Sequence, residues 1–208
     1  AVATREATAH TGCTHGLQEG SPSKAKADFE AITAESMFSD LCFVIDATGS
    51  MGRYLKALRG MVHTLVDSLY DRYPDMTVRV AVIAYKDLDP ESEDLSERPV
   101  EKLDFTTDVH QVESFVGNVH PQGGGDIPED MLAGLDEMSR LSWDVRSTRL
   151  AFVIADAPCH GQRFHPFPDA FPDEPDPHGL TAEGILSTLD DHGVRLYFPR
   201  INAATSQM

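Results

Sequence analysis

The chain has 208 residues, 41% of them hydrophobic, which is enough to bury one sizeable core. Its 34 acidic residues outnumber the 17 basic ones and give a formal net charge of -17. This charge argues against nucleic acid as a partner, because binding to a phosphate backbone requires a basic surface. An acidic balance is compatible with cation binding, although ordinary solubility accounts for it more simply.

Residues 1–36 are rich in small and polar residues without sustained periodicity, so we expect a flexible N-terminal segment there and one domain over residues 37–208. The chain begins with Ala1 and stops shortly after its last apolar run. We therefore expect a piece of a longer protein, truncated near the C-terminus of the domain.

From Met37 onward, short apolar runs alternate with amphipathic patterns. The runs, rich in β-branched and aromatic residues, predict buried strands at 41–45, 77–84, 150–155 and 194–198. Apolar residues at three- and four-residue steps predict helices at 54–70, 109–119 and 181–191, and a further helix that opens at Pro128 and runs toward Trp143.

Residues 100–105, after the acidic loop 87–97, fit a short edge strand. The alternation predicts an α/β fold of three layers: a doubly wound, mostly parallel sheet with one antiparallel edge strand and helices on both faces. In such folds ligands bind at the carboxyl ends of the strands.

The three cysteines, Cys13, Cys42 and Cys159, are odd in number and lack the spacing of a disulfide framework or a zinc finger, so a reducing compartment fits best. The sequence has no apolar signal-peptide core and no apolar stretch long enough to cross a bilayer. We therefore expect a cytoplasmic chain without a membrane span.

Oxygen-bearing side chains stand where three segments reach the expected binding edge. They are Asp46, Thr48 and Ser50 after one strand, Asp126 after a run of three glycines, and Asp156 after another strand. An Asp-x-Thr-x-Ser turn places a carboxylate and two hydroxyls at alternate positions, so all three can face one point. These hard oxygens predict a Mg²⁺ site, with Mn²⁺ or Ca²⁺ as alternatives.

This combination resembles the metal-ion-dependent adhesion site of von Willebrand factor A domains, over roughly residues 40–200. More narrowly, the sequence is similar to the A domains that accompany atypical alpha-kinases. The motifs that carry this likeness are Asp46-Ala-Thr-Gly-Ser-Met51, Ala84-Tyr-Lys-Asp87, Gly123-Gly-Gly-Asp-Ile-Pro-Glu-Asp130 and Asp156-Ala-Pro-Cys-His-Gly161. The resemblance implies the metal ligands Asp46, Thr48, Ser50, Asp126 and Asp156.

Two positions depart from the family pattern Asp-x-Ser-x-Ser with a later threonine. Thr48 replaces the middle serine and keeps its hydroxyl, whereas Asp126 replaces the neutral threonine with a carboxylate. A further carboxylate holds a cation more tightly and weakens its attraction for an acidic partner.

Local roles are the alternative explanation for several of these residues. Asp126 and Glu129 have the spacing of a capping box at the start of a helix, and Ser50 is placed to cap the helix that follows it. Asp46 alternatively has the place of a simple turn residue, although three such signals coincide less readily by chance than they do in a family site. These alternatives leave a bare scaffold without a metal.

The loops beside the site are expected to form a partner-binding rim, made of Met51, Tyr85, Asp87, Gly124, Gly125, His160 and His165. Cys159, His160 and His165, with His178 nearby, also suggest zinc, but their spacing fits no known zinc motif. We expect them to order the long loop or to touch a partner.

We therefore predict a non-enzymatic interaction module whose bound ion accepts an Asp or Glu side chain from a protein partner. The resemblance implies that a linked kinase domain, if any, lies outside this chain, and the sequence has no phosphate-binding P-loop. The alternative is a metal-dependent hydrolase in which the same cation activates water and His160 or His165 acts as acid or base.

Overall fold

The computed structural model describes residues 37–92, 95, 98–199 and 201–208. The expected flexible segment over residues 1–36 lies outside this part of the chain. The described elements are β1 (Phe38–Asp46), a short 3₁₀ helix η1 (Gly49–Met51), α2 (Gly52–Arg72), β2 (Thr77–Tyr85), β3 (Val100–Thr106), α3 (Val109–Asn118), α4 (Met131–Ser139), β4 (Thr148–Ile154), α5 (Ala182–Asp191) and β5 (Val194–Tyr197). None of the helices in the described ranges is long and apolar enough to cross a bilayer.

The five strands form one sheet in the order β3-β2-β1-β4-β5. β1 pairs in parallel with both β2 and β4, and β4 pairs in parallel with β5. Only β3, at one edge, is antiparallel to its neighbour β2. The expected mostly parallel sheet with one antiparallel edge strand is therefore confirmed.

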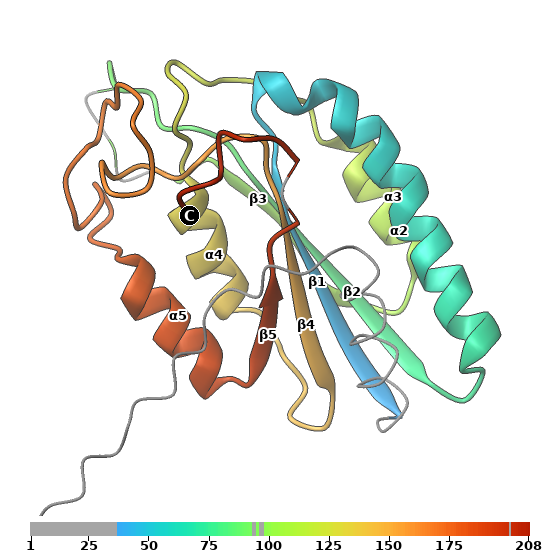
Figure 1. Cartoon of the computed structure of the whole chain (residues 1–208). Coiled ribbons are helices and arrows are strands. Elements are labelled where there is room, and N and C mark those ends of the chain that lie inside the picture. Colours follow the sequence, from blue (N-terminus) through green and yellow to red (C-terminus); the bar gives the residue numbers. More distant parts are fainter. Residues whose placement is uncertain (1–36, 93–94, 96–97, 200) are drawn as a thin grey trace, which may run out of the picture.

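Helices cover both faces of this sheet. Figure 1 shows α2 and α3 on one side of it and α4 and α5 on the other. Each face has its own apolar core, and the central strand β1 contributes to both. Leu41, Phe43 and Ile45 pack toward α2, whereas Cys42 and Val44 pack toward α4. A strand with both faces buried needs an unbroken apolar run, which explains the pattern seen in the sequence.

Helix α4 begins later than the sequence indicated. It starts at Met131 rather than at Pro128, and Asp130 caps it by accepting a hydrogen bond from the Ala133 N–H at 3.2 Å. Glu129, just before the helix, forms an isolated parallel bridge with Cys159 instead, and its N–H donates to the Pro158 carbonyl at 2.9 Å. The alternative explanation of Asp126 and Glu129 as a capping box is wrong, since Asp130 caps the helix.

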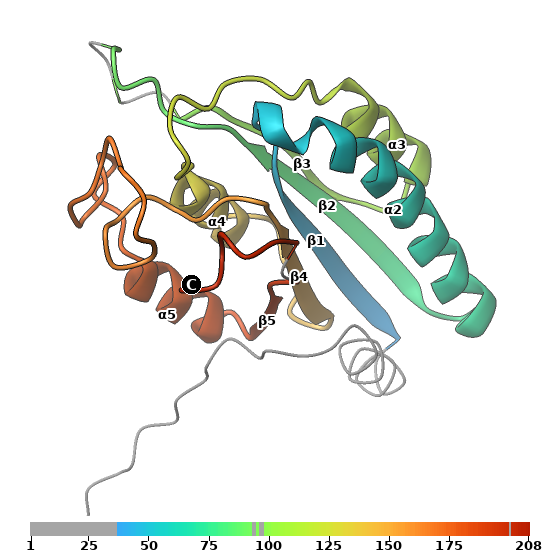
Figure 2. The same cartoon turned by 45° about the horizontal axis from the view of Figure 1, so that its top comes forward.

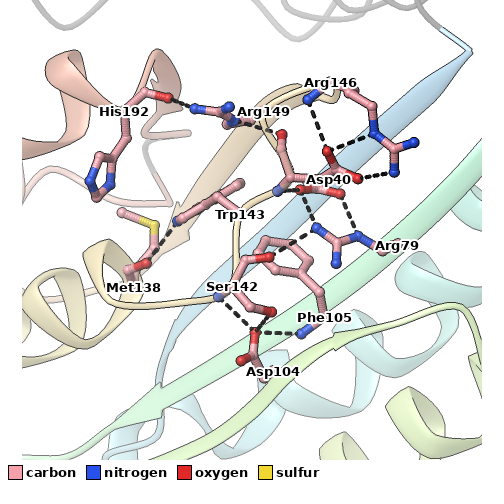
Figure 3. A network of polar contacts seen from close by, with 11 residues as sticks. Asp40, Arg79, Asp104, Phe105, Met138, Ser142, Trp143, Arg146, Arg149 and His192 are labelled. Atoms are coloured by element: carbon pink, nitrogen blue, oxygen red, sulfur yellow. Dashed lines mark hydrogen bonds and ion pairs between the residues drawn. The ribbon is translucent and has the colours of Figure 1, made fainter.

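The opposite end of the sheet, where β1 begins, is closed by a polar network (Figure 3). Asp40 is fully buried and accepts two hydrogen bonds from the Arg79 guanidinium, at 2.8 and 2.6 Å, and a third from the Asp144 N–H at 2.8 Å. Nearby, Asp104 accepts from the backbone and hydroxyl of Ser142. Asp40 thus ties β1 to β2 and to the segment before β4.

Replacing Asp40 with Ala is expected to lower the free energy of unfolding by about 3–5 kcal/mol, because it leaves the Arg79 charge partly buried without its partner. Urea unfolding followed by circular dichroism measures this loss. Asp144→Ala is the control, since its side chain pairs with the exposed Arg146 and its removal should cost much less. Equal losses in the two variants would contradict the assigned role of Asp40.

Candidate metal centre

The carboxylate of Asp46 lies fully buried at the end of the central strand β1. Its Oδ1 accepts hydrogen bonds from the Thr48 N–H at 2.8 Å and from the Thr48 hydroxyl at 2.7 Å. Its Oδ2 is also buried and has no hydrogen-bond partner among the described residues. A buried carboxylate oxygen without a partner is costly, and a cation bound to this atom would remove that cost.

The side chains of Ser50 and Asp156 bring two further potential metal ligands to this turn. The Ser50 hydroxyl donates to Asp156 Oδ1 at 2.7 Å, and the hydroxyl oxygens of Thr48 and Ser50 are 3.5 Å apart. Asp156 follows β4, which pairs directly with β1, so the sheet itself brings the two aspartates to one edge. We call Asp46, Thr48, Ser50 and Asp156 the first cluster.

Glu129 lies beside the first cluster, although the sequence suggested only a helix-capping role for it. The residue is 4% exposed. Its backbone carbonyl accepts a hydrogen bond from the His160 N–H at 3.3 Å, in addition to the bond from its own N–H to the Pro158 carbonyl. A Cβ atom added to Gly124 would lie 3.1 Å from Glu129 Oε1 and 3.8 Å from Thr48 Cβ. The carboxyl of Glu129 is therefore packed between the glycine loop and the first cluster.

Burial and neighbouring charge disturb the ionisation of these acids. Burial, and then the charges of Asp46 and Asp87, raise the pKa of Glu129 to about 9. Burial also raises the pKa of Asp46 to about 6, with hydrogen bonds from Thr48 opposing the rise and Asp156 adding to it. Carboxylates crowded in this way favour a divalent cation, which neutralises them.

The donors of the first cluster fit Mg²⁺. They are carboxylate and hydroxyl oxygens, which are the ligands that this hard cation prefers, and they include neither imidazole nor thiolate. Asp46, Thr48, Ser50 and Asp156 would hold the ion, which would supply a positive centre able to attract an external oxygen ligand.

Asp126 does not join this first cluster in the hydrogen-bond network of the described residues. Its Oδ2 accepts from the Ala170 N–H at 2.7 Å, and its Oδ1 is buried without a partner among the described residues. Potential ligand atoms of Asp87, Asp126 and His160 all lie within 4.8 Å of one another. We call these three residues the second cluster.

The loops that carry both clusters follow β1, β2, α3 and β4 and gather at one end of the sheet (Figure 2). A family model for the von Willebrand factor A domain matches residues 40–165, which include every residue of both clusters. The chain belongs to this family. Its members are protein-interaction modules, and many of them depend on a metal.

Two curated proteins resemble this von Willebrand factor A domain in sequence. The alpha-protein kinase vwkA of Dictyostelium discoideum is 32% identical over 184 residues, which cover 88% of this chain and 28% of the kinase. The putative ariadne-like RING finger protein R811 of Acanthamoeba polyphaga mimivirus is 30% identical over 121 residues, 58% of this chain and 11% of that protein. The chain thus spans less than a third of either relative.

Among solved structures, the pilus adhesin SpaC of Lactobacillus rhamnosus GG in its open conformation has a similar fold. It matches with a TM-score of 0.53 and 16% identity, over 77% of this chain and 23% of the adhesin. A second structure of the same adhesin matches with a TM-score of 0.51 and 14% identity over 77% of this chain and 24% of the adhesin. At these identities the likeness supports the fold of the von Willebrand factor A domain and nothing further.

Part of the rim expected for this von Willebrand factor A domain is wrong. Met51 and Tyr85 are fully buried and His165 is 1% exposed, so a partner cannot touch them on the folded domain. Gly124 and Gly125 are exposed, as a rim requires. The suggestion that Ser50 caps a helix is also wrong, because its hydroxyl bonds to Asp156 instead.

The histidines of the long loop order that loop. His160 and His165 both contact Asp169, at 2.7 and 3.2 Å, and His178 contacts Asp130 at 3.2 Å. Cys159 is buried and takes no part in these contacts. Burial raises the pKa of its thiol to about 12, so in the metal-free fold the thiol is protonated at neutral pH.

Proposed function

We propose that this von Willebrand factor A domain is a metal-dependent protein-interaction module. In this proposal Asp46, Thr48, Ser50 and Asp156 hold a divalent cation, Mg²⁺ or alternatively Mn²⁺ or Ca²⁺. The ion accepts an Asp or Glu side chain from a protein partner. The observation that carries the proposal is the buried Oδ2 of Asp46, which has no partner in the described part of the chain and lies beside three other oxygen-bearing side chains.

The exposure of the first cluster supports access by a partner. Asp46, Thr48 and Asp156 are buried, whereas Ser50 is exposed at the edge of the cluster. The exposed Gly124 and Gly125 lie beside it and have no side chains to block an approaching carboxylate.

The likeness to alpha-protein kinase vwkA supports a role next to a kinase. We propose that the domain recruits a protein partner to, or positions, a kinase domain that lies outside this chain. Both cysteines in the described part of the chain, Cys42 and Cys159, are free and buried, which supports a reducing, cytoplasmic location.

The hydrolase alternative gains no support from the geometry. His160 is 4% exposed, and its two ring nitrogens contact Asp169 and Asp87. His165 is buried, with one ring nitrogen accepting from the Phe167 N–H and the other contacting Asp169. A general acid or base must reach a substrate proton, and both rings have their nitrogens occupied within the fold.

A capture experiment tests the proposal. The immobilised chain is expected to retain partner proteins from an extract in Mg²⁺ and to lose them in a chelator. Asp156→Asn should lose the same proteins even in Mg²⁺, because one ion ligand loses its charge while the hydrogen bond from Ser50 can persist. Asp75→Asn, the same change at an exposed turn residue, is the control. Capture that is equal with and without Mg²⁺ would contradict the proposal.

A further inference from the structure

The second cluster stands beside the first but is built from other elements. Asp87 follows β2, Asp126 follows the glycine loop, and His160 follows β4. The side chains of Asp87 and His160 are only 3% and 4% exposed. The two carboxylates and the buried imidazole have potential ligand atoms within 4.8 Å of one another. Together they offer a metal ion both oxygen and nitrogen ligands.

Each carboxylate of the second cluster is oriented by a backbone hydrogen bond from outside the cluster. The Ala170 N–H donates to Asp126 Oδ2 at 2.7 Å, and the Gly125 N–H donates to Asp87 Oδ2 at 3.3 Å. Asp126 Oδ1 remains buried without a partner in the part of the chain that the structure describes. Asp87 Oδ1 accepts from the Leu88 N–H at 2.8 Å and lies 2.9 Å from His160 Nε2, so the carboxylates of both Asp87 and Asp126 are held in place.

The ring of His160 is oriented in the same manner. Its Nδ1 lies 2.7 Å from Asp169 Oδ1, and Asp169 also accepts hydrogen bonds from the N–H groups of Gly161 and Phe171, both at 2.8 Å. Its Nε2 lies 2.9 Å from Asp87 Oδ1. With Nδ1 bonded to Asp169, an ion bound at Nε2 would take the place of the proton that this nitrogen shares with Asp87 Oδ1, and a carboxylate at the other ring nitrogen is the usual arrangement of metal-bound histidines.

Glu129 supplies an independent indication of a cation-binding site here. Its side chain is nearly fully buried, and its Oε2 has no hydrogen-bond partner among the described residues. Its Oε1 lies 3.1 Å from the position that a Cβ atom on Gly124 would occupy. The N–H of the next residue, Gly125, donates to Asp87 Oδ2. The carboxyl of Glu129 therefore stands between the first and the second cluster, where an unsatisfied buried acceptor calls for a cation.

We propose that Asp87, Asp126 and His160 form a second divalent-cation site, separate from the first cluster, with Glu129 between the two. The imidazole ligand favours Mn²⁺ or Zn²⁺ over Mg²⁺ and Ca²⁺, which take oxygen ligands. Ligand atoms on opposite sides of such an ion lie about 4.2 Å apart, from bond lengths near 2.1 Å. Atoms already within 4.8 Å of one another need only a small contraction. Asp126 is thereby assigned to this site rather than to the first cluster.

Counting bound ions tests the second site. The metal-free chain is titrated with Mn²⁺, and the free ion is followed by electron paramagnetic resonance. The wild-type chain is expected to bind two ions, and Asp126→Asn and Asp46→Asn one each. A single ion that Asp46→Asn abolishes and Asp126→Asn leaves in place would overturn the second site but not the proposed function. A single ion with the reverse dependence would support the second site and contradict the proposed function.

The nitrogen ligand gives a signature that a merely structural role would not produce. Bound Mn²⁺ is expected to show ¹⁴N hyperfine coupling in the wild-type chain and in Asp46→Asn, and no such coupling in His160→Gln or Asp126→Asn. His165→Gln is the matched control, since His165 contacts the same Asp169 from outside the cluster. Zn²⁺ should displace the coupled ion at concentrations at which Mg²⁺ does not. Absence of ¹⁴N coupling in the wild-type chain with bound Mn²⁺ would overturn the proposal.

Discussion

Asp46→Asn is expected to abolish the rise in melting temperature that Mg²⁺ gives the wild-type domain. At a Mg²⁺ concentration a hundred times the dissociation constant, a cation bound only to the folded state adds about 2.7 kcal/mol. For a domain of this size that corresponds to roughly 5–10 °C. The asparagine keeps the oxygen that accepts both Thr48 hydrogen bonds but lacks the negative charge that the ion requires.

The same variant has an opposite effect without metal. Burial raises the pKa of Asp46 to about 6, so its ionised form at pH 7.5 is unfavourable in the metal-free fold. In chelator, Asp46→Asn should therefore melt no lower than the wild-type domain. Differential scanning fluorimetry with and without Mg²⁺ measures both effects, with Asp75→Asn as the control for the loss of one exposed charge. A variant that melts far lower in chelator would indicate a structural role instead.

Much of the fold could be predicted from the sequence, because burial leaves a clear pattern in it. The central strand β1 lies between two parallel neighbours and two helical layers, and this environment requires the unbroken run that ends at Asp46. The predicted start of α4 was wrong because Pro128 is well suited to a first helical turn. The structure instead places Glu129 in a parallel bridge to Cys159, in the segment after β4, a long-range pairing that no local pattern reveals.

The first cluster was predictable in part for a related reason. Asp46, Thr48 and Ser50 are close in sequence, and Asp156 follows a strand that pairs directly with β1, so topology alone brings them together. Glu129 was missed as a site residue, since Glu129 with Asp126 has the spacing of an ordinary helix cap. The one available signal was an acidic pair, Glu129 and Asp130, directly before an apolar helix.

The grouping of Asp126 with Asp87 and His160 depended on the path of two long loops. Asp126 is fixed by the backbone of Ala170, 44 residues away, and His160 is fixed by Asp169 within its own loop. Spacing along the chain contains no information on such contacts. The sequence therefore identified Asp87, Asp126 and His160 as residues near a site but assigned them to different roles.

The stabilisation by Mg²⁺ is expected to grow as the pH rises from 6 to 9, because of Glu129. Burial, then Asp46 and Asp87, raise the pKa of this group from its ordinary 4.5 to about 9 in the metal-free fold. Its contribution to stability is therefore fully present below about pH 4.5 and is lost as the pH rises through 9, because the unfolded chain releases the proton more readily. A cation beside Glu129 favours the ionised form, so the loss at high pH should disappear when the metal is bound.

Glu129→Gln separates this effect from other titrations. The amide cannot ionise, so in chelator the variant should be more stable than the wild-type domain at pH 9 and close to it at pH 5, and its Mg²⁺ response should be smaller and less dependent on pH. Melting curves at pH 6, 7.5 and 9, with Mg²⁺ or chelator, provide the comparison, and Glu91→Gln at an exposed position is the control. If the wild-type domain gains the same number of degrees from Mg²⁺ at pH 6 and at pH 9, Glu129 does not face the ion. A response that grows with pH in the wild-type domain but not in Glu129→Gln would place this carboxylate next to the bound cation.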